Sequence, residues 1–179
     1  MVAILALAIL LVRHERAVRA REIAETCRGW QRAIADIQAR PTRQPPRETH
    51  RTAIEDAVSG SDMDFLWTAR TWLADHPTEA LRLLPFLTTP GYLGLTNSAD
   101  VMVRGRELPF YGHGYVTSED LFTQSGRASW LLHEVTGRQG VPHAVVGSNP
   151  IVLADLAKDW QAWFDDLDGG RACFPSPSR

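Results

Sequence analysis

The chain is poor in the residue types that most often build reactive centres. Its 179 residues include two cysteines, Cys27 and Cys173, which stand near opposite ends. Two thiols are too few for a miniprotein stapled by several disulfides, or for a zinc or iron–sulfur site built from cysteine alone. Cys27 falls on the apolar seam of a predicted helix, so we expect it to be a small core residue and not a reactive thiol.

Signatures of the common nucleotide-binding and hydrolytic folds are absent as well. The chain has no Gly-x-Gly-x-x-Gly, no Gly-x-x-x-x-Gly-Lys and no Gly-x-Ser-x-Gly. His133 and Glu134 begin like a zinc-protease motif, but Gly137 occupies the position that the second histidine ligand would need. We therefore expect a protein without enzymatic activity and without a cofactor.

What the chain does have is enough apolar sequence for a folded core and an uneven distribution of charge. Hydrophobic residues make up 44% of it. Residues 13–51 hold ten arginines and five acids, whereas residues 52–179 hold nine basic and sixteen acidic groups, which gives the net charge of −2. Because the larger part is acidic and the arginines are interleaved with acids, we expect no nucleic-acid binding.

An uninterrupted apolar run extends from Val2 to Val12. As a helix it measures about 17 Å, against the roughly 30 Å of a bilayer's hydrocarbon core. It has no polar face to turn towards water, so we expect residues 1–12 to enter a lipid bilayer as a partial span, an embedded tip or the end of a longer segment. The arginines that follow favour a cytoplasmic position for the rest of the chain, and a periplasmic position stays open.

From residue 13 to residue 40 the apolar residues recur at helical spacing and form one narrow seam. A seam on a long helix next to a membrane needs a partner, which is either the body of this protein or another chain. Trp67 lies off the apolar face of its own predicted helix and is expected to be exposed. The residues that we expect to contact partner subunits of a membrane protein complex are Val18, Ile23, Trp30, Ile34 and Trp67.

Three prolines between Pro41 and Arg47 interrupt the helical pattern and mark the best boundary in the chain. We therefore expect four parts. They are a membrane tip with an amphipathic helix over 1–40, a proline-rich linker over 41–48, a compact α-hairpin domain over 49–170 and a flexible tail over 171–179.

Start and stop signals in the third part predict a mainly α fold. The predicted helices run from about 49 to 58, from Ser61 through Leu73, from Pro77 through Leu87 with Leu81, Leu84 and Leu87 inward, from Thr117 for a short stretch, from Ser125 to a stop at Gly137, and from an Asn149 cap to Gly169 with Val152, Leu156 and Trp160 inward. The glycine-rich segment 91–117 breaks this pattern and predicts an irregular strap or a small β-hairpin.

The segment RASWLLHEVTG (127–137), followed by Trp160 and Trp163 on the next helix, resembles a pattern in uncharacterised bacterial HEAT-like helical proteins. The tracts LTNSADVMVRG (95–105) and FYGHGY (110–115) are similar to segments of such proteins. The resemblance implies a HEAT-like domain and a binding surface, and it carries no activity with it.

One cluster offers an alternative. His113 stands between two glycines, which lets a ligand approach the backbone and the ring closely. With the nearby Asp100 and Glu107, and with His133 folded back, it would form a metal site for a hydrolase. The preferred hypothesis is a membrane-tethered accessory or stabilising subunit of a bacterial membrane protein complex, and the alternative is this metal-assisted hydrolase.

Overall fold

The computed structural model describes residues 2–40, 53–60, 63–91, 121–144 and 148–174. Within these ranges the chain is mainly α-helical, as predicted, with six helices and no strand. The helices are α1 (Val2–Gln38), α2 (Ala53–Ser59), α3 (Met63–Asp75), the 3₁₀ helix η1 (Pro77–Thr88), α5 (Gln124–Thr136) and α6 (Pro150–Asp166).

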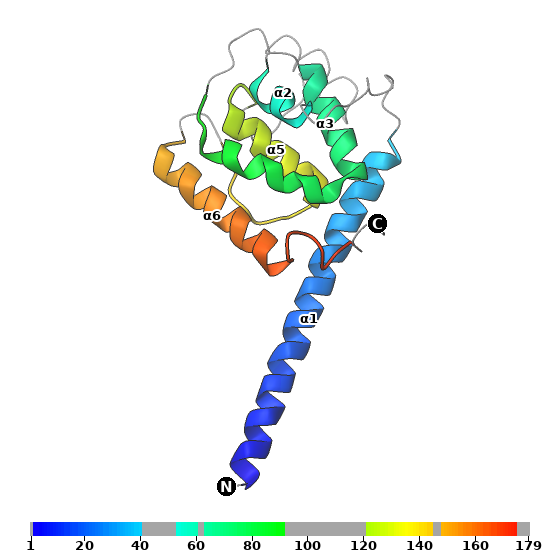
Figure 1. The fold of residues 1–179 in the computed structure, drawn as a ribbon, viewed down its shortest axis with the longest axis vertical. Coiled ribbons are helices and arrows are strands. Elements are labelled where there is room, and N and C mark those ends of the chain that lie inside the picture. Colours follow the sequence, from blue (N-terminus) through cyan, green and yellow to red (C-terminus); the bar gives the residue numbers. More distant parts are fainter. Residues whose placement is uncertain (1, 41–52, 61–62, 92–120, 145–147, 175–179) are drawn as a thin grey trace.

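Helix α1 is a single long rod of which only one half touches the rest of the molecule. Its 37 residues span about 55 Å. The C-terminal part packs against α3 and α5, while the N-terminal part stands clear of the body (Figure 1). Trp30, Ile34 and Ile37 are buried, whereas every residue from Leu7 to Glu22 is exposed. No helix in the described ranges is both long and apolar enough to cross a bilayer.

The two C-terminal helices begin and end where local chemistry dictates. The Asn149 side chain accepts a hydrogen bond from the backbone N–H of Val152, and Pro150 occupies the first turn of α6, as predicted. Helix α5 begins at Gln124, one residue earlier than expected, and Thr123, not Ser125, accepts the capping bond from the backbone N–H of Gly126. Gly137 ends this helix with a φ of 64°, a left-handed conformation that glycine adopts readily.

The inward faces of two predicted helices are corrected by the structure. Residues 77–88 form a 3₁₀ helix that packs against α5 and α6, and its buried side chains are Ala80, Leu83 and Leu87. Leu81 and Leu84, which were expected to point inward, are only half-buried. In α6, Leu153 takes the buried position that was predicted for Val152, and Leu156 and Trp160 follow it as expected.

Buried arginines fasten the helices of the body to one another. The guanidinium of Arg127, on α5, donates to the carbonyl oxygens of Leu121 (2.8 Å), Ala57 (3.1 Å) and Gly60 (2.6 Å). The last two carbonyls lie at the C-terminal end of α2, where a helix leaves acceptors unpaired. Arg70 of α3 likewise pairs with Glu134 of α5 at 2.7 Å.

The segment after α6 turns back onto α1 and is held there by a disulfide. Cys27 and Cys173 are bonded, with Cα atoms 4.9 Å apart. Phe174 packs edge-on against Trp30 at 5.1 Å, and the Gln31 side chain donates to the Cys173 carbonyl. Cys173 and Phe174 of the predicted tail are therefore packed against α1, and Cys27 is a core residue, as expected, but one with a covalent partner.

Several predicted features lie outside the described residues. They are the proline-rich linker 41–48, most of the strap 91–117, the Ser61 cap and the short helix at Thr117. The start of the helix predicted at about 49 lies there too, and its described part, α2, ends next to Gly60 as the sequence indicated.

Candidate membrane and partner interface

The free end of α1 carries a sleeve of exposed apolar side chains. We use the term apolar sleeve for Leu7, Ile9, Leu10, Leu11 and Val12, whose exposed fractions lie between 46% and 61%. At 100° per residue these five positions surround the helix axis, so no face of the sleeve is polar. Monomeric soluble proteins rarely expose such a continuous apolar surface, which marks a site of contact with lipid or with another protein.

Between the sleeve and the body, α1 and the end of α6 diverge and leave an open groove of about 630 Å³. Its apolar lining comes from Val18 and Ile23 of α1 and from Trp163 and Leu167 beyond them. We call this space the α1–α6 groove. Val18 has an exposed fraction of 38%, whereas Ile23, the other apolar residue of α1 in the groove, is half-buried.

Charged side chains border this groove. Arg19 and Asp166 bridge it with an ion pair of 2.8 Å, and both side chains are mostly exposed, so the pair contributes little to stability. Glu15 and Glu22 line the same space from α1. The groove therefore combines an apolar floor with a charged rim.

The structure places the five predicted contact residues in three different surroundings. Val18 and Ile23 line the α1–α6 groove, where a partner can reach them. Trp30 and Ile34 are buried in the protein's own core, so the C-terminal half of the seam is covered by the body. Trp67 is half-buried and packs edge-on against Trp130 with ring centroids 5.1 Å apart.

A smaller recess of about 300 Å³ lies beside the groove, next to Gly29 and Trp163. Arg138 lines it and lies over the rings of Trp160 and Trp163, with its guanidinium carbon 4.8 and 5.4 Å from the two centroids. Burial lowers the pKa of Arg138, and the neighbouring carboxylate of Asp159 partly offsets this effect. The arrangement fixes the loop after α5 to α6 through a cation–π contact.

The histidine cluster of the alternative hypothesis is described only in part. His113, Asp100 and Glu107 lie outside the described residues. His133 lies at the end of α5, where its Nδ1 is 3.2 Å from the carbonyl oxygen of Arg138 and its ring contacts His143 and Trp160. Within the described ranges, no group of three or more potential ligands is placed to hold a metal ion.

The disulfide is the feature of this region that sequence reasoning missed. Only the even number of cysteines and the position of Cys27 on a buried helix face pointed towards it. The two cysteines are 146 positions apart in the sequence, so no local pattern connects them. The consequence of the disulfide for the site is mechanical, since it fixes α1 to the segment that follows α6, one residue after Thr26 of the groove lining.

No protein-family model, curated protein or solved structure matches this chain.

Proposed function

We propose that this chain is a non-enzymatic, membrane-tethered interaction protein, an accessory or stabilising subunit of a membrane protein complex. The observation that carries the proposal is the apolar sleeve, which projects from the body and is exposed on all sides (Figure 1). Full burial of one large aliphatic side chain contributes roughly 1.5–3 kcal/mol. Five such side chains on one rod supply enough free energy to hold a protein of this size at a bilayer.

The attachment of α1 to the body supports a tether that keeps a fixed geometry. Val12 and Cys27 are separated by about 22 Å of helix. From Cys27 onwards, packing around Trp30 and the disulfide to Cys173 hold the helix against the body. A rod that is clamped at one end and embedded at the other sets both the height and the orientation of the body above the membrane.

The α1–α6 groove supports an interaction with a second protein. It lies between the sleeve and the body, so a partner helix at the membrane surface would meet Val18, Ile23 and Trp163 first. These side chains offer apolar contact area, and an interface of this kind is usually dominated by a few aromatic and aliphatic residues at its centre.

The disulfide bears on the compartment in which the body resides. Structural disulfides persist in oxidising compartments and are rare in the reducing cytosol. The arginines after the sleeve favour a cytoplasmic body, but that tendency is a statistical bias of flanking charge. The covalent bond between Cys27 and Cys173 opposes that tendency, and we infer that the body occupies the oxidising side of the membrane.

Membrane fractionation tests the tether. The wild-type chain is expected to sediment with membranes, to resist a high-salt wash and to be released by detergent. Replacing Leu10 and Leu11 with serine is expected to move it to the soluble fraction. The matched control replaces Ile151 and Val152, two exposed apolar residues on α6, and should leave sedimentation unchanged. A wild-type chain in the soluble fraction contradicts the proposal.

Thiol labelling tests the compartment separately. When cells are lysed in the presence of an alkylating reagent, Cys27 and Cys173 are expected to stay unmodified until the sample is reduced. Cysteines that react without reduction would place the body in a reducing compartment and leave the membrane tether unaffected.

A further inference from the structure

The arginines and the acids next to the apolar sleeve lie on opposite sides of α1. Arg13, Arg16 and Arg21 fall within an arc of about 140° when successive residues are placed 100° apart. Glu15 and Glu22 lie roughly 170° from the centre of that arc. The two acids line the α1–α6 groove, so the arginines occupy the face of the helix that points away from the body.

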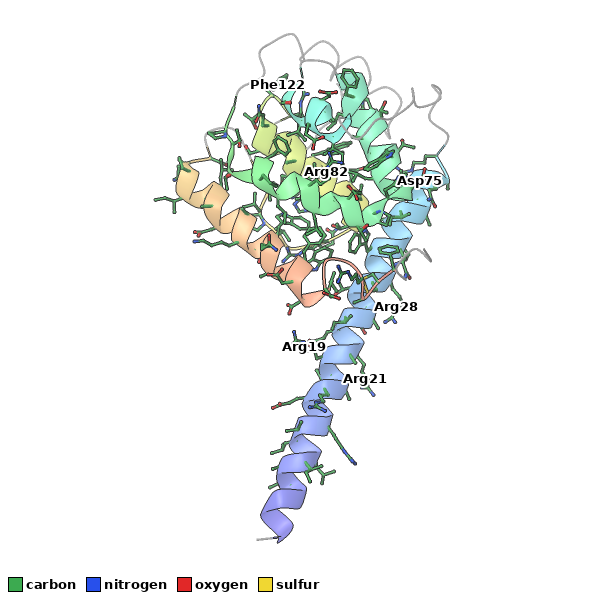
Figure 2. All side chains as sticks on the ribbon, in the orientation of Figure 1. Arg19, Arg21, Arg28, Asp75, Arg82 and Phe122 are labelled. Atoms are coloured by element: carbon green, nitrogen blue, oxygen red, sulfur yellow. A yellow bond between two sulfur atoms is a disulfide. The ribbon has the colours of Figure 1, made fainter. Side chains whose placement is uncertain are left out.

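Figure 2 shows the same division among the labelled side chains, with Arg19 on the side of α6 and Arg21 on the opposite side. Arg19 forms an ion pair with Asp166 on the side of the groove and is not part of the opposite face. Arg13, Arg16 and Arg21 are exposed, and none of them joins an ion pair within the described parts of the chain. We call these three residues the arginine face.

We propose that the arginine face binds the headgroups of anionic phospholipids, an inference that rests on the proposed membrane tether. The face begins directly after Val12, the last residue of the sleeve. Arg13 and Arg16 lie about 1.5 and 6 Å further along the helix axis, within the headgroup layer of roughly 5–8 Å that borders the hydrocarbon. Lipid phosphates therefore surround these guanidinium groups when the sleeve is embedded.

The direction of the side chains adds to this placement. In an α-helix the Cα–Cβ bonds tilt towards the N-terminus, and long side chains continue in that direction. The N-terminal end of α1 carries the sleeve, so its arginines lean towards the bilayer. Arg21 lies about 13 Å beyond Val12, within reach of the surface potential when its side chain extends that way.

Charge complementarity distinguishes lipid from the alternative occupant, a protein. A guanidinium binds phosphate through paired N–H donors, and each arginine near an anionic surface strengthens attachment severalfold. Between the arginines this face carries only Ala17 and Ala20, which offer a protein partner no large apolar anchor.

The experiment measures binding of the full chain to vesicles. One set contains phosphatidylcholine alone, and the other contains phosphatidylcholine with phosphatidylglycerol. The wild-type chain is expected to bind both sets through the sleeve and to prefer the anionic set at low salt. The R13Q/R16Q variant is expected to lose about 10- to 30-fold in affinity for anionic vesicles and little for neutral ones. High salt should reduce the wild-type preference.

The R28Q/R32Q variant is the matched control. It removes the same number of charges from exposed positions on α1, but about 24 and 30 Å beyond Val12. It should bind both vesicle sets like the wild type. Equal wild-type affinity for the two sets, or an equal loss in the two variants, overturns the inference and leaves the tether standing. Wild-type affinity of R13Q/R16Q for the anionic vesicles also overturns the inference. If the wild-type chain binds neither set of vesicles, the proposed membrane tether is contradicted, and the inference that rests on it fails too.

Discussion

Gly170 lies directly against the indole ring of Trp30. A Cβ atom at Gly170 would come within 2.9 Å of the Cη2 atom of that ring, and the glycine has a φ of 88°. The chain turns here from α6 towards Cys173, so this contact allows the C-terminal segment to cross the face of α1.

The contact predicts that Gly170→Ala lowers the free energy of unfolding by about 2–4 kcal/mol. One part is the cost of a side chain at positive φ, and the other is the displacement of Trp30 in a packed core. Gly140→Ala is the matched control, because Gly140 has a φ of 76° and open space around its Cβ position. It should lose only the first part. Chemical denaturation measures both, and equal losses would contradict the role of Trp30.

Removing the disulfide is expected to destabilise the fold strongly. The bond closes a loop across 146 residues, for which the chain-entropy model gives about 5 kcal/mol. The Cys27→Ala/Cys173→Ala variant should unfold at lower denaturant, and the wild type treated with a reductant should approach it. If the reductant leaves the wild-type transition where it was, the bond is absent from the native protein.

Arg127 is expected to be the most sensitive charged residue of the body. Arg127→Met leaves the carbonyl oxygens of Leu121, Ala57 and Gly60 without their donors, and we expect a loss of about 3–5 kcal/mol. The control is Arg171→Met, where an exposed arginine pairs with Asp168 at 3.7 Å, and it should cost less than about 0.5 kcal/mol. Thermal and chemical unfolding of the two variants make the comparison, and similar losses would contradict the anchoring role.

Replacing Arg138 is expected to alter tryptophan fluorescence more than stability. Arg138→Gln removes the cation–π contacts with Trp160 and Trp163 and the ion pair with Asp159, but it also removes the desolvation of a charge. We expect a loss of about 1 kcal/mol and a shifted emission maximum. Arg138→Lys keeps the charge without the planar stack and should give an intermediate spectrum. An unchanged spectrum in both variants would place the guanidinium away from the rings.

The sequence predicted the helical class and several helix ends because their causes are local. The Asn149 cap, the Gly137 stop and the helical spacing of the seam depend on neighbours within a few residues. The seam residues Trp30 and Ile34 were also correctly placed on one face. What no local pattern could decide was whether the body or another chain covers that face.

The remaining errors arise from contacts between distant segments. In the 3₁₀ helix at Pro77–Thr88, packing against α5 and α6 buries Ala80 and Leu83 instead of Leu81 and Leu84, and no local pattern could choose between these two faces. The disulfide depends on the path of the chain after α6, which turns on Gly169 and Gly170 at positive φ. Val18 and Ile23, which were predicted as partner contacts, line the α1–α6 groove, and their contact with a partner stays a prediction; Trp163, which also lines the groove, was not predicted.

The position of Cys173 has a consequence for biogenesis. Helix α1 leaves the ribosome before the rest of the body, and Cys173, which bonds to Cys27, follows 146 residues later with Phe174, which covers Trp30. Until then the newly made helix offers a bare indole and a free thiol to chaperones and oxidoreductases. Folding of this protein is therefore completed only after translation has passed Phe174, and formation of the disulfide requires that α1 and the segment after α6 are already in contact.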